Sequence, residues 1–228
     1  MSAQPAGAIG EAPAPSVPDP EFRVLGVRAV RYAAAPMLAL DLEVSEQTGR
    51  PIYMIALKIQ LMIEPARRVY DDDTRDRLTE LFGAPERWAV TTRSLVWSQL
   101  DVVVPAFTGS TTVVVPIACN YDLEVTAAKY LHSLPDGEAP LALHFNGVVY
   151  YPGEDGGLQM VLVPWTRSVD YRMPVTVWRE TIEHYYPNTG WVGLRADTLA
   201  SLQRLKVERG LATFDACVAE LLAESRGD

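Results

Sequence analysis

The stretch Ile52–Glu64, IYMIALKIQLMIE, decides the fold of this chain. Apolar side chains occupy every second position in it, namely Tyr53, Ile55, Leu57, Ile59, Leu61 and Ile63. Residues two apart lie on the same face of a β-strand, whereas a helical face recurs every three to four residues. The stretch therefore predicts a long strand with one strongly hydrophobic face, and that face requires a core to cover it.

Two pairs of alternating segments are predicted to form β-hairpins. Leu38–Glu46 leads through a short polar turn that contains Gly49 into the strand described above. Leu95–Val104 leads through Phe107–Ser110 into Thr111–Ile117. A short polar connection with glycine between two alternating runs is typical of antiparallel neighbours.

Further alternating segments extend the same pattern across most of the chain. The additional strands are predicted at Phe22–Val30, Asp122–Leu131, Leu141–Tyr151 and Leu158–Trp165. Short strands that follow one another at close spacing favour a sandwich or a barrel over a parallel sheet with crossover helices, and the sandwich is the form predicted here. The predicted fold class is therefore α+β, with a mainly antiparallel β-sandwich over residues 22–173.

One insertion, Asp73–Phe82, has helical spacing instead. Acidic residues lie at its start, and Leu78, Leu81 and Phe82 share one helical face. Gly83 can adopt the left-handed conformation that closes a helix. The aspartates could alternatively bind a hard cation, but the ligand spacing of an EF-hand loop is missing. A short capped helix is the favoured interpretation.

Helical spacing returns after the last predicted strand. Apolar residues follow Pro174 at intervals of three or four, and these are Val175, Trp178, Ile182 and Tyr185. This spacing places them on one face of a helix, with Pro174 in its first turn. The helix is predicted to lie against the sheet, and the whole section from residue 174 to 228 is predicted to be helical.

The composition of the 228-residue chain is that of a globular protein, with 48% hydrophobic and 21% charged residues. Met1–Glu21 is rich in alanine and proline, which predicts a disordered tail. The tail has neither the positive start nor the apolar run of a secretory signal, and no segment is apolar enough to span a membrane. A cytoplasmic protein without membrane insertion is therefore expected. The formal net charge of −9 disfavours binding to nucleic acid.

No set of residues with catalytic or metal-binding spacing is recognisable in the sequence. No catalytic residue, cofactor or metal site is therefore predicted. The two cysteines, Cys119 and Cys217, are far apart and belong to no CxxC pair. They are expected to be reduced thiols rather than a disulfide.

Two histidines and several aromatic residues form the candidate surface for a ligand or a protein partner. His132 and His144 are predicted to lie on neighbouring strands, which makes them the pair to test for a catalytic role. Tyrosine and tryptophan combine a large apolar surface with a polar tip, so they are common both in cores and at recognition sites. The aromatic candidates are Trp165, Tyr186 and Trp191.

The C-terminal segment has the pattern of a short strand, a helix, a break and a second helix. Trp191–Arg195 is the expected strand and Gly210 is the expected break. This pattern resembles a ribbon-helix-helix unit, in which the strand pairs with its twin in a homodimer and can enter the DNA major groove. The resemblance implies self-association through Val192, Leu194, Leu199, Leu202, Leu205, Phe214, Val218 and Leu221. DNA binding is not expected because the segment is almost neutral, and a plain pair of helices packed on the sandwich is the alternative.

A second resemblance covers nearly the whole chain after the tail. The segments on which it rests are Arg31–Pro36, Pro105–Thr111, Tyr121–Val125, Val163–Trp165, Val177–Arg179 and Tyr186–Trp191. Together they resemble an uncharacterised bacterial family that is often encoded beside nickel-iron hydrogenase genes. The resemblance implies a role in hydrogenase assembly or maturation, with hydrogenase subunits or maturation proteins as partners. It carries over no catalytic residue, and the sequence has no cysteine cluster of the kind that holds an iron–sulfur cluster.

These observations favour a non-enzymatic accessory or protein-interaction module, with a homodimer as its expected state. Two alternatives stay open: a small-molecule-binding or hydrolytic β-sandwich that uses the histidine region, and a ribbon-helix-helix regulator that binds DNA. A histidine within hydrogen-bond reach of a carboxylate or hydroxyl, inside a polar cleft, would favour the first alternative.

Overall fold

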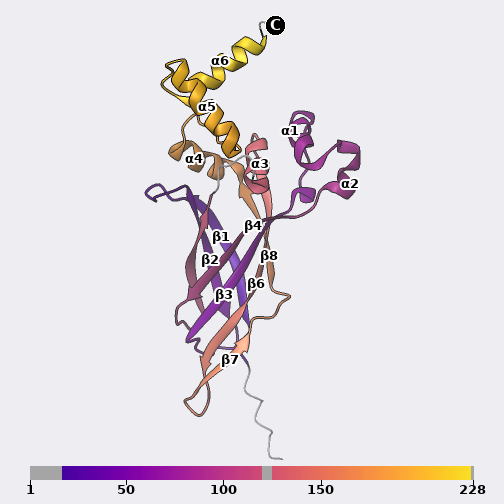
Figure 1. The fold of residues 1–228 in the computed structure, drawn as a ribbon. Coiled ribbons are helices and arrows are strands. Elements are labelled where there is room, and N and C mark those ends of the chain that lie inside the picture. The colour runs from indigo at the N-terminus through magenta and orange to yellow at the C-terminus, as the bar shows by residue number, and fades with distance from the viewer. Residues whose placement is uncertain (1–16, 120–124, 227–228) are drawn as a thin grey trace, which may run out of the picture.

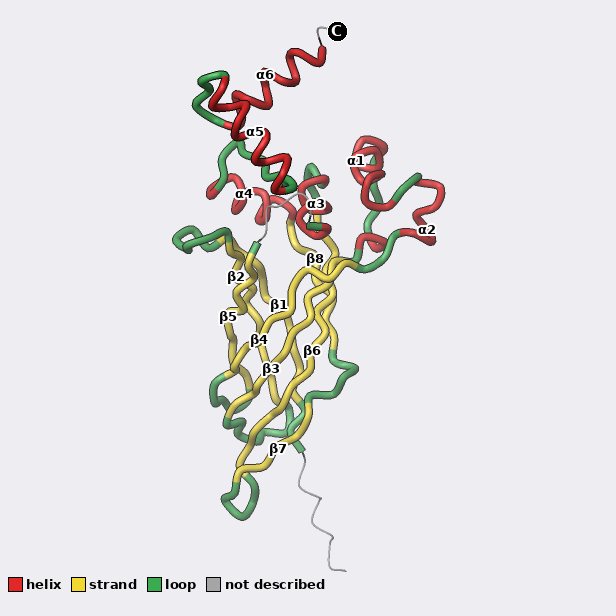
Figure 2. The backbone as a smooth tube through the Cα atoms, in the orientation of Figure 1, coloured by secondary structure: helices red, strands yellow, loops and turns green. Residues whose placement is uncertain are grey.

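Two antiparallel sheets form an elongated sandwich, and the helices gather at one end of it (Figure 1; Figure 2). The computed structural model describes residues 17–119 and 125–226. The first sheet has the order β1 (Pro20–Ala29), β2 (Met37–Glu46), β5 (Ser110–Ala118). The second has the order β4 (Leu95–Val104), β3 (Met54–Ile63), β6 (Glu138–Pro152), β7 (Leu158–Leu162), and β8 (Ser168–Pro174) pairs with the first half of β6. The predicted α+β fold with an antiparallel sandwich is confirmed.

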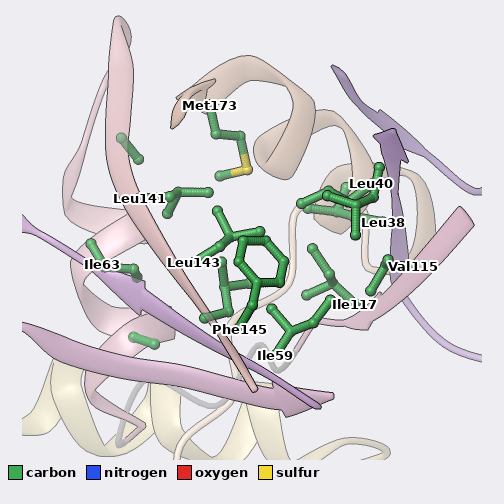
Figure 3. Close-up of a cluster of buried hydrophobic side chains, with 14 of the residues drawn as sticks. Leu38, Leu40, Ile59, Ile63, Val115, Ile117, Leu141, Leu143, Phe145 and Met173 are labelled. Atoms are coloured by element: carbon green, nitrogen blue, oxygen red, sulfur yellow. The ribbon is translucent and has the colours of Figure 1, made fainter. Parts of the chain in front are cut away.

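The core lies between the inner faces of the two sheets (Figure 3). On β3, Ile55, Leu57, Ile59, Leu61 and Ile63 are at most 1% exposed, as the alternation predicts. They face the alternating side chains of β2 and β5 in the other sheet; these are Leu38, Leu40, Leu42, Val44, Val113, Val115 and Ile117. Removing this apolar area from water is the main favourable term in folding. Tyr53 was expected in the same row but is exposed, because β3 begins one residue later at Met54.

An insertion between β3 and β4 contains most of the short helices. Its elements are η1 (Pro65–Arg67), α1 (Asp72–Phe82), η2 (Pro85–Arg87) and α2 (Trp88–Thr91). The side chain of Asp71 caps α1 by accepting a hydrogen bond of 2.7 Å from the Thr74 amide, and Gly83 ends the helix with a φ of 75°. The predicted capped helix is confirmed, with Leu78 and Phe82 buried on its inner face.

The remaining helices are α3 (Thr126–Ser133), α4 (Val175–Tyr185), α5 (Ala196–Glu208) and α6 (Phe214–Arg226). Pro174 is the N-cap of α4, whose side chains Val175, Trp178 and Ile182 are at most 4% exposed. The helix contacts β1, β2 and β8, so it closes one end of the sandwich core, as predicted. None of the helices in the described part of the chain is long and apolar enough to cross a lipid bilayer.

Both predicted hairpins are wrong. β2 pairs with β1 and β5, whereas β3 pairs with β4 and β6, so the connection after β2 carries the chain from one sheet to the other. The connection after β4 also changes sheets, and an isolated bridge between Ile52 and Phe107 joins the two crossings. The physical reason is that β2 and β3 are both apolar enough to be central strands. Facing one another across the core buries their inner faces more completely than lying side by side.

The predicted strand Asp122–Leu131 is also wrong over its described residues. Residues 126–133 form α3, whose buried side chains include Ala127, Tyr130 and Leu131, at the spacing of a helical face. Residues 122–124 lie outside the described part of the chain. Conversely, β8 was not predicted, although Val169, Tyr171 and Met173 alternate along it.

The boundaries at the two ends of the sandwich also differ from those expected. β1 begins at Pro20 rather than at Phe22, so it includes two residues that were assigned to the tail. Most of that tail, residues 1–16, lies outside the described part of the chain. β7 ends at Leu162, so Trp165 follows the strand instead of belonging to it.

Gly147 allows β3 and β6 to approach closely. It pairs with Leu57 and has a φ of 151°, and a Cβ at this position would lie 2.2 Å from the Ala56 carbonyl oxygen. A side chain therefore meets backbone, which cannot move aside as a flexible side chain does.

Replacing Gly147 with alanine is expected to lower the free energy of unfolding by roughly 2–5 kcal/mol, from strain and overpacking together. Urea denaturation measures the loss. Gly26→Ala is the matched control, because a Cβ there meets nothing within 4 Å and the residue also lies in a strand. An equal loss in the two variants would contradict this account of Gly147.

Glu46 is a carboxylate in a buried position, at 3% exposure. Its two oxygens accept hydrogen bonds from the amides of Thr48 at 3.0 Å and Arg50 at 3.2 Å. Burial alone would raise the pKa of Glu46, but these hydrogen bonds to the charged form outweigh it and hold the pKa below its ordinary value. The ionised carboxylate thus closes the turn that leads from the first sheet to the second.

The pKa of Glu46 is lower in the folded protein than in the unfolded chain. The ionised carboxylate therefore contributes fully to folding stability above its ordinary pKa, and this contribution is lost as the pH falls through the pKa of the folded state. Glu46→Gln offers one acceptor instead of two and is expected to cost about 1–3 kcal/mol at neutral pH. That cost should shrink on acidification. Denaturation at neutral and acidic pH measures it, with the exposed Glu21→Gln on β1 as control. A cost independent of pH would exclude the ionised carboxylate as the cause.

Candidate functional site

The α5–α6 hairpin lies beyond α4, away from the two sheets (Figure 1). Gly210, with a φ of 64°, ends α5 and turns the chain back. The Leu211 amide donates to the Lys206 carbonyl at 2.9 Å, which satisfies an acceptor in the last helical turn. Thr213 then caps α6 by accepting from the Ala216 amide at 3.1 Å. The break predicted at Gly210 is therefore present.

Polar contacts hold the two helices of the hairpin together. Arg209 lies 3.2 Å from Glu220 and 2.7 Å from Glu224, so one guanidinium bridges two turns of α6. The ammonium of Lys206 lies 5.4 Å from the centre of the Phe214 ring, within cation–π range. These contacts are at the surface, where each contributes little to stability.

Many apolar side chains of the hairpin are partly exposed. Cys217 is the one residue of α5 and α6 that is classed as buried. Leu202 and Leu205 are half-buried. Between 37% and 68% of the residue surface is exposed at Leu199, Val207, Phe214, Val218, Leu221 and Leu222. On α6, Phe214, Val218, Leu221 and Leu222 recur at helical spacing and form one partly exposed apolar face.

The segment before the hairpin is only partly like the expected ribbon. Trp191 takes part in a single β-bridge, and no strand covers residues 191–195 in the described chain. Trp191, Val192 and Leu194 are 47–66% exposed. The Trp191 ring lies 5.0 Å from that of Tyr186, so these two candidates are brought together at the end of α4.

The other candidate surface residues are not assembled into one site. His132 lies on α3 rather than on a strand, which corrects the predicted neighbouring pair, and His144 points outward from β6. Burial, and then the positive charges of Arg179 and Arg77, lower the pKa of His132. Trp165 follows β7 and is 87% exposed. The five candidates therefore occupy different faces, apart from the Tyr186–Trp191 pair.

A cleft that the sequence did not predict lies within the insertion between β3 and β4. Its volume is about 580 Å³, and its walls include Arg68, Tyr70, Trp88 and Thr92. The hydroxyl oxygen of Thr92 is buried without a hydrogen-bond partner in the described structure. All of its lining residues belong to the segment from residue 65 to 92, in which the sequence predicted only a helix and gave no motif for a binding site.

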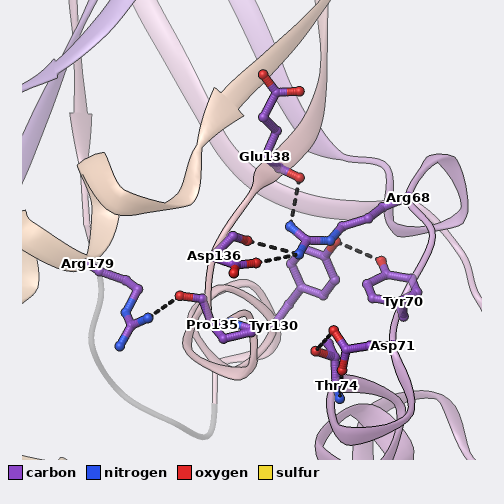
Figure 4. Close-up of polar contacts among 9 residues, drawn as sticks. All are labelled: Arg68, Tyr70, Asp71, Thr74, Tyr130, Pro135, Asp136, Glu138 and Arg179. Atoms are coloured by element: carbon purple, nitrogen blue, oxygen red, sulfur yellow. Dashed lines mark hydrogen bonds and ion pairs between the residues drawn. The ribbon is translucent and has the colours of Figure 1, made fainter.

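Arg68 organises one wall of this cleft (Figure 4). Its guanidinium donates to the carbonyls of Glu138 and Asp136, each at 2.9 Å, and lies 5.8 Å from the centre of the Tyr70 ring. Gly137, between those two carbonyls, has a φ of 72°, and a Cβ there would lie 3.3 Å from the guanidinium. Arg68 therefore ties the insertion to the first residues of β6.

Two tyrosine hydroxyls meet beneath Arg68. The oxygen atoms of Tyr70 and Tyr130 are 2.8 Å apart (Figure 4). The Tyr70 hydroxyl donates to the Pro65 carbonyl oxygen at 2.7 Å. Burial is the largest cause that raises the pKa of both hydroxyls, so they stay protonated at neutral pH. The pair serves as a structural link between the insertion and α3 and supplies neither an anionic nucleophile nor a general base.

Burial also raises the pKa of the Cys119 thiol to about 12, which leaves almost no nucleophilic thiolate at neutral pH. Cys119 and Cys217 are both free and buried. Across residues 17–119 and 125–226, no group of three or more histidine, cysteine, aspartate or glutamate side chains is arranged to hold a metal ion.

The model of a family of unknown function, DUF6084, matches residues 17–228. No curated protein matches the chain significantly. Among solved structures, the putative ApaA protein from Bordetella pertussis is 13% identical, with 68% of this chain and 93% of that chain covered and a TM-score of 0.24. The β-glucosidase 3B from Thermotoga neapolitana, in complex with α-D-glucose, is 9% identical, with 68% and 17% covered and a TM-score of 0.24. Neither likeness bears on the function of this chain.

Replacing Tyr70 with phenylalanine is expected to destabilise the protein by about 1–3 kcal/mol, because it leaves the Pro65 carbonyl and the Tyr130 hydroxyl without this partner. Tyr130→Phe is the matched variant and should cost less, since Tyr70 still donates to Pro65. Thermal and urea denaturation of both variants measure the difference. A larger loss for Tyr130→Phe would contradict the direction assigned to these hydrogen bonds.

Proposed function

Because the chain belongs to DUF6084, a family of unknown function, we propose a function from the geometry of its own residues. The protein is a non-enzymatic accessory module that binds another protein through the α5–α6 hairpin. The observation that carries this proposal is the partly exposed apolar face of the hairpin, which includes Val218 and Leu222. Exposed apolar patches of this kind mark protein-interaction sites.

The length of the two helices supports the same proposal. Each has 13 residues, and isolated helices of about 12–15 residues are marginal in water. Helices in proteins gain most of their stability by burying an amphipathic face against other elements. In the described structure several apolar side chains of α5 and α6 stay partly exposed, so a partner that covers the apolar face would stabilise the hairpin.

The partner we propose is a subunit of a nickel-iron hydrogenase or one of its maturation proteins. The support for this partner is the resemblance carried by segments such as Val163–Trp165 and Tyr186–Trp191. The competing partner is a second copy of this chain, which would cover the same apolar face, as the ribbon-helix-helix resemblance implies. A second copy and a hydrogenase component would compete for the hairpin, so their binding can be told apart by measurement.

Val218→Asp combined with Leu222→Asp places two charges on neighbouring positions of the exposed face. Both residues are already exposed, so the double variant should fold while its affinity for the partner falls at least about tenfold. Val90→Asp on α2 is the matched control, because Val90 is also an exposed valine, at 73%. Affinity purification from the native host, under conditions where the hydrogenase is expressed, measures capture by the wild type and the two variants.

Capture of hydrogenase components by the wild type and Val90→Asp, but not by the double variant, is the expected result. Light scattering on the purified proteins decides whether a homodimer uses the same face. A wild type that captures no hydrogenase component would overturn the proposed partner. Equal capture by all three proteins would overturn the assignment of the hairpin.

Small-molecule binding is the second candidate function, and the cleft beside Trp88 favours it. The cleft combines an aromatic wall with the guanidinium of Arg68 and the unpartnered hydroxyl of Thr92. Clefts of several hundred Å³ with few polar groups are typical of ligand sites. A ligand there should change the fluorescence of Trp88, and this change should be absent in Trp88→Phe.

DNA binding, the remaining alternative, has less physical support. The chain carries a net charge of −9, and phosphate neutralisation by basic side chains dominates affinity for DNA. Arg195, the basic residue of the expected ribbon, is engaged with Asp197 at 2.7 Å. We therefore propose that the hairpin binds protein and does not read DNA.

A further inference from the structure

The second sheet ends in a strand whose outer edge is open. β7 pairs with the second half of β6, and within the described residues no other strand lies against its far side. The strand has the sequence LQMVL, without a charged residue or a proline. Natural sheets usually protect exposed edges with charged residues, prolines or bulges, because an open edge is a template for pairing with another chain. β7 has none of these protections within its five residues.

The hydrogen-bond pattern shows which backbone groups of β7 point outward. The Val163 amide donates to Gly147, and the Gly153 amide donates to the carbonyl of Gly157, at the two ends of the β6–β7 ladder. Residues along an antiparallel strand alternate between facing the partner and facing away. The N–H and C=O groups of Leu158, Met160 and Leu162 therefore face the open edge, whereas those of Gln159 and Val161 face β6.

The side chains of the same three residues lie on the outer face of the sheet. Leu158 is 60% exposed, and Met160 and Leu162 are each 71% exposed. The cross-strand register places Val148 of β6 beside Leu162, and then Ala56 and Val103 of the next two strands. Val103 is itself 64% exposed. An apolar row thus crosses the outer face of the sheet and ends at the open edge.

We propose that β7 pairs with β7 of a second copy of this chain, antiparallel and about a two-fold axis at Met160. In this register Met160 lies opposite Met160 of the second copy, and Leu158 lies opposite Leu162. The outward N–H and C=O groups of these residues then meet in hydrogen-bonded pairs, so every open donor and acceptor of β7 is satisfied. The two second sheets become one continuous sheet across the dimer.

The second copy fits this edge because the strand is complementary to itself. The two-fold axis at Met160 places Leu158 opposite Leu162 and Gln159 opposite Val161 of the second copy. On the outer face apolar residues therefore meet apolar residues, and the interface buries no charge. A two-fold interface requires this self-complementarity.

Hydrogen exchange resolved by residue tests the pairing directly. The amides of Leu158, Met160 and Leu162 should exchange rapidly in dilute protein and at least about tenfold more slowly when the protein is concentrated enough to dimerise. The amides of Gln159 and Val161 should be protected at both concentrations, because they are bonded to β6. A dimer through the α5–α6 hairpin would leave the three outward amides unprotected, so the two modes of association are distinguishable.

Charge substitution at the axis tests the register. Met160→Lys places like charges directly opposite one another, and Met160→Asp does the same with the opposite sign, so each should raise the dimer dissociation constant at least about tenfold. An equal mixture of the two variants should recover association, since lysine then faces aspartate. Val114→Lys on β5 is the control, because it adds a charge at a 52% exposed position of another edge strand.

Analytical ultracentrifugation of the full chain measures association. The Val218→Asp and Leu222→Asp changes are present in every sample, so that the hairpin does not contribute. The expected result is a dimer for this background and for Val114→Lys, monomers for the two Met160 variants, and a dimer for their mixture. A monomeric background, a dimer indifferent to Met160→Lys, or a mixture that stays monomeric would overturn the proposal.

Discussion

The contact between the inner faces of the two sheets is the interaction on which the rest of the structure depends. β2 and β3 are each paired on both edges, and their fully buried side chains meet across the core. Neither strand can leave without opening a whole sheet, so the two central strands give the sandwich its cooperativity. α4 closes one end of this core with Trp178, which is 2% exposed. The insertion is then tied to the sandwich by polar contacts, chiefly those of Arg68 and Tyr70.

This core does not depend on two surfaces that remain apolar and uncovered. The α5–α6 hairpin and β7 contribute little buried area to the central cluster, apart from Val161, which packs against it from the edge. Exposed apolar side chains such as Leu222 and Met160 add little to folding stability and favour association with other molecules. Binding to specific partners gives a physical reason for both surfaces. The buried tyrosine pair and Cys119, in contrast, are held in their protonated forms.

The sequence predicted the elements more successfully than their pairing. Alternation along Ile55–Ile63 and helical spacing along Val175–Ile182 have the same period as burial, so both elements were identified. The prediction of strand pairing failed because alternation indicates that a strand has a buried face but does not indicate which strand lies beside it. β2 and β3 were therefore wrongly predicted to form a hairpin. The same limit applies to β7, whose alternating leucines indicated a strand while facing outward. The cleft beside Trp88 lies within the insertion, but its shape depends on how the short helices there pack together, and no motif in the sequence specifies that packing.

The positions of the two apolar surfaces have a consequence for assembly. β7 and the α5–α6 hairpin lie at opposite ends of the elongated sandwich (Figure 1). Pairing about a two-fold axis at Met160 would join two molecules at their β7 ends and leave both hairpins uncovered at the far ends. Such a dimer presents two identical docking elements, and binding of the first to a multi-subunit partner raises the effective concentration of the second. Modest affinity at each small apolar face is then sufficient for stable attachment, without a large hydrophobic patch on either molecule.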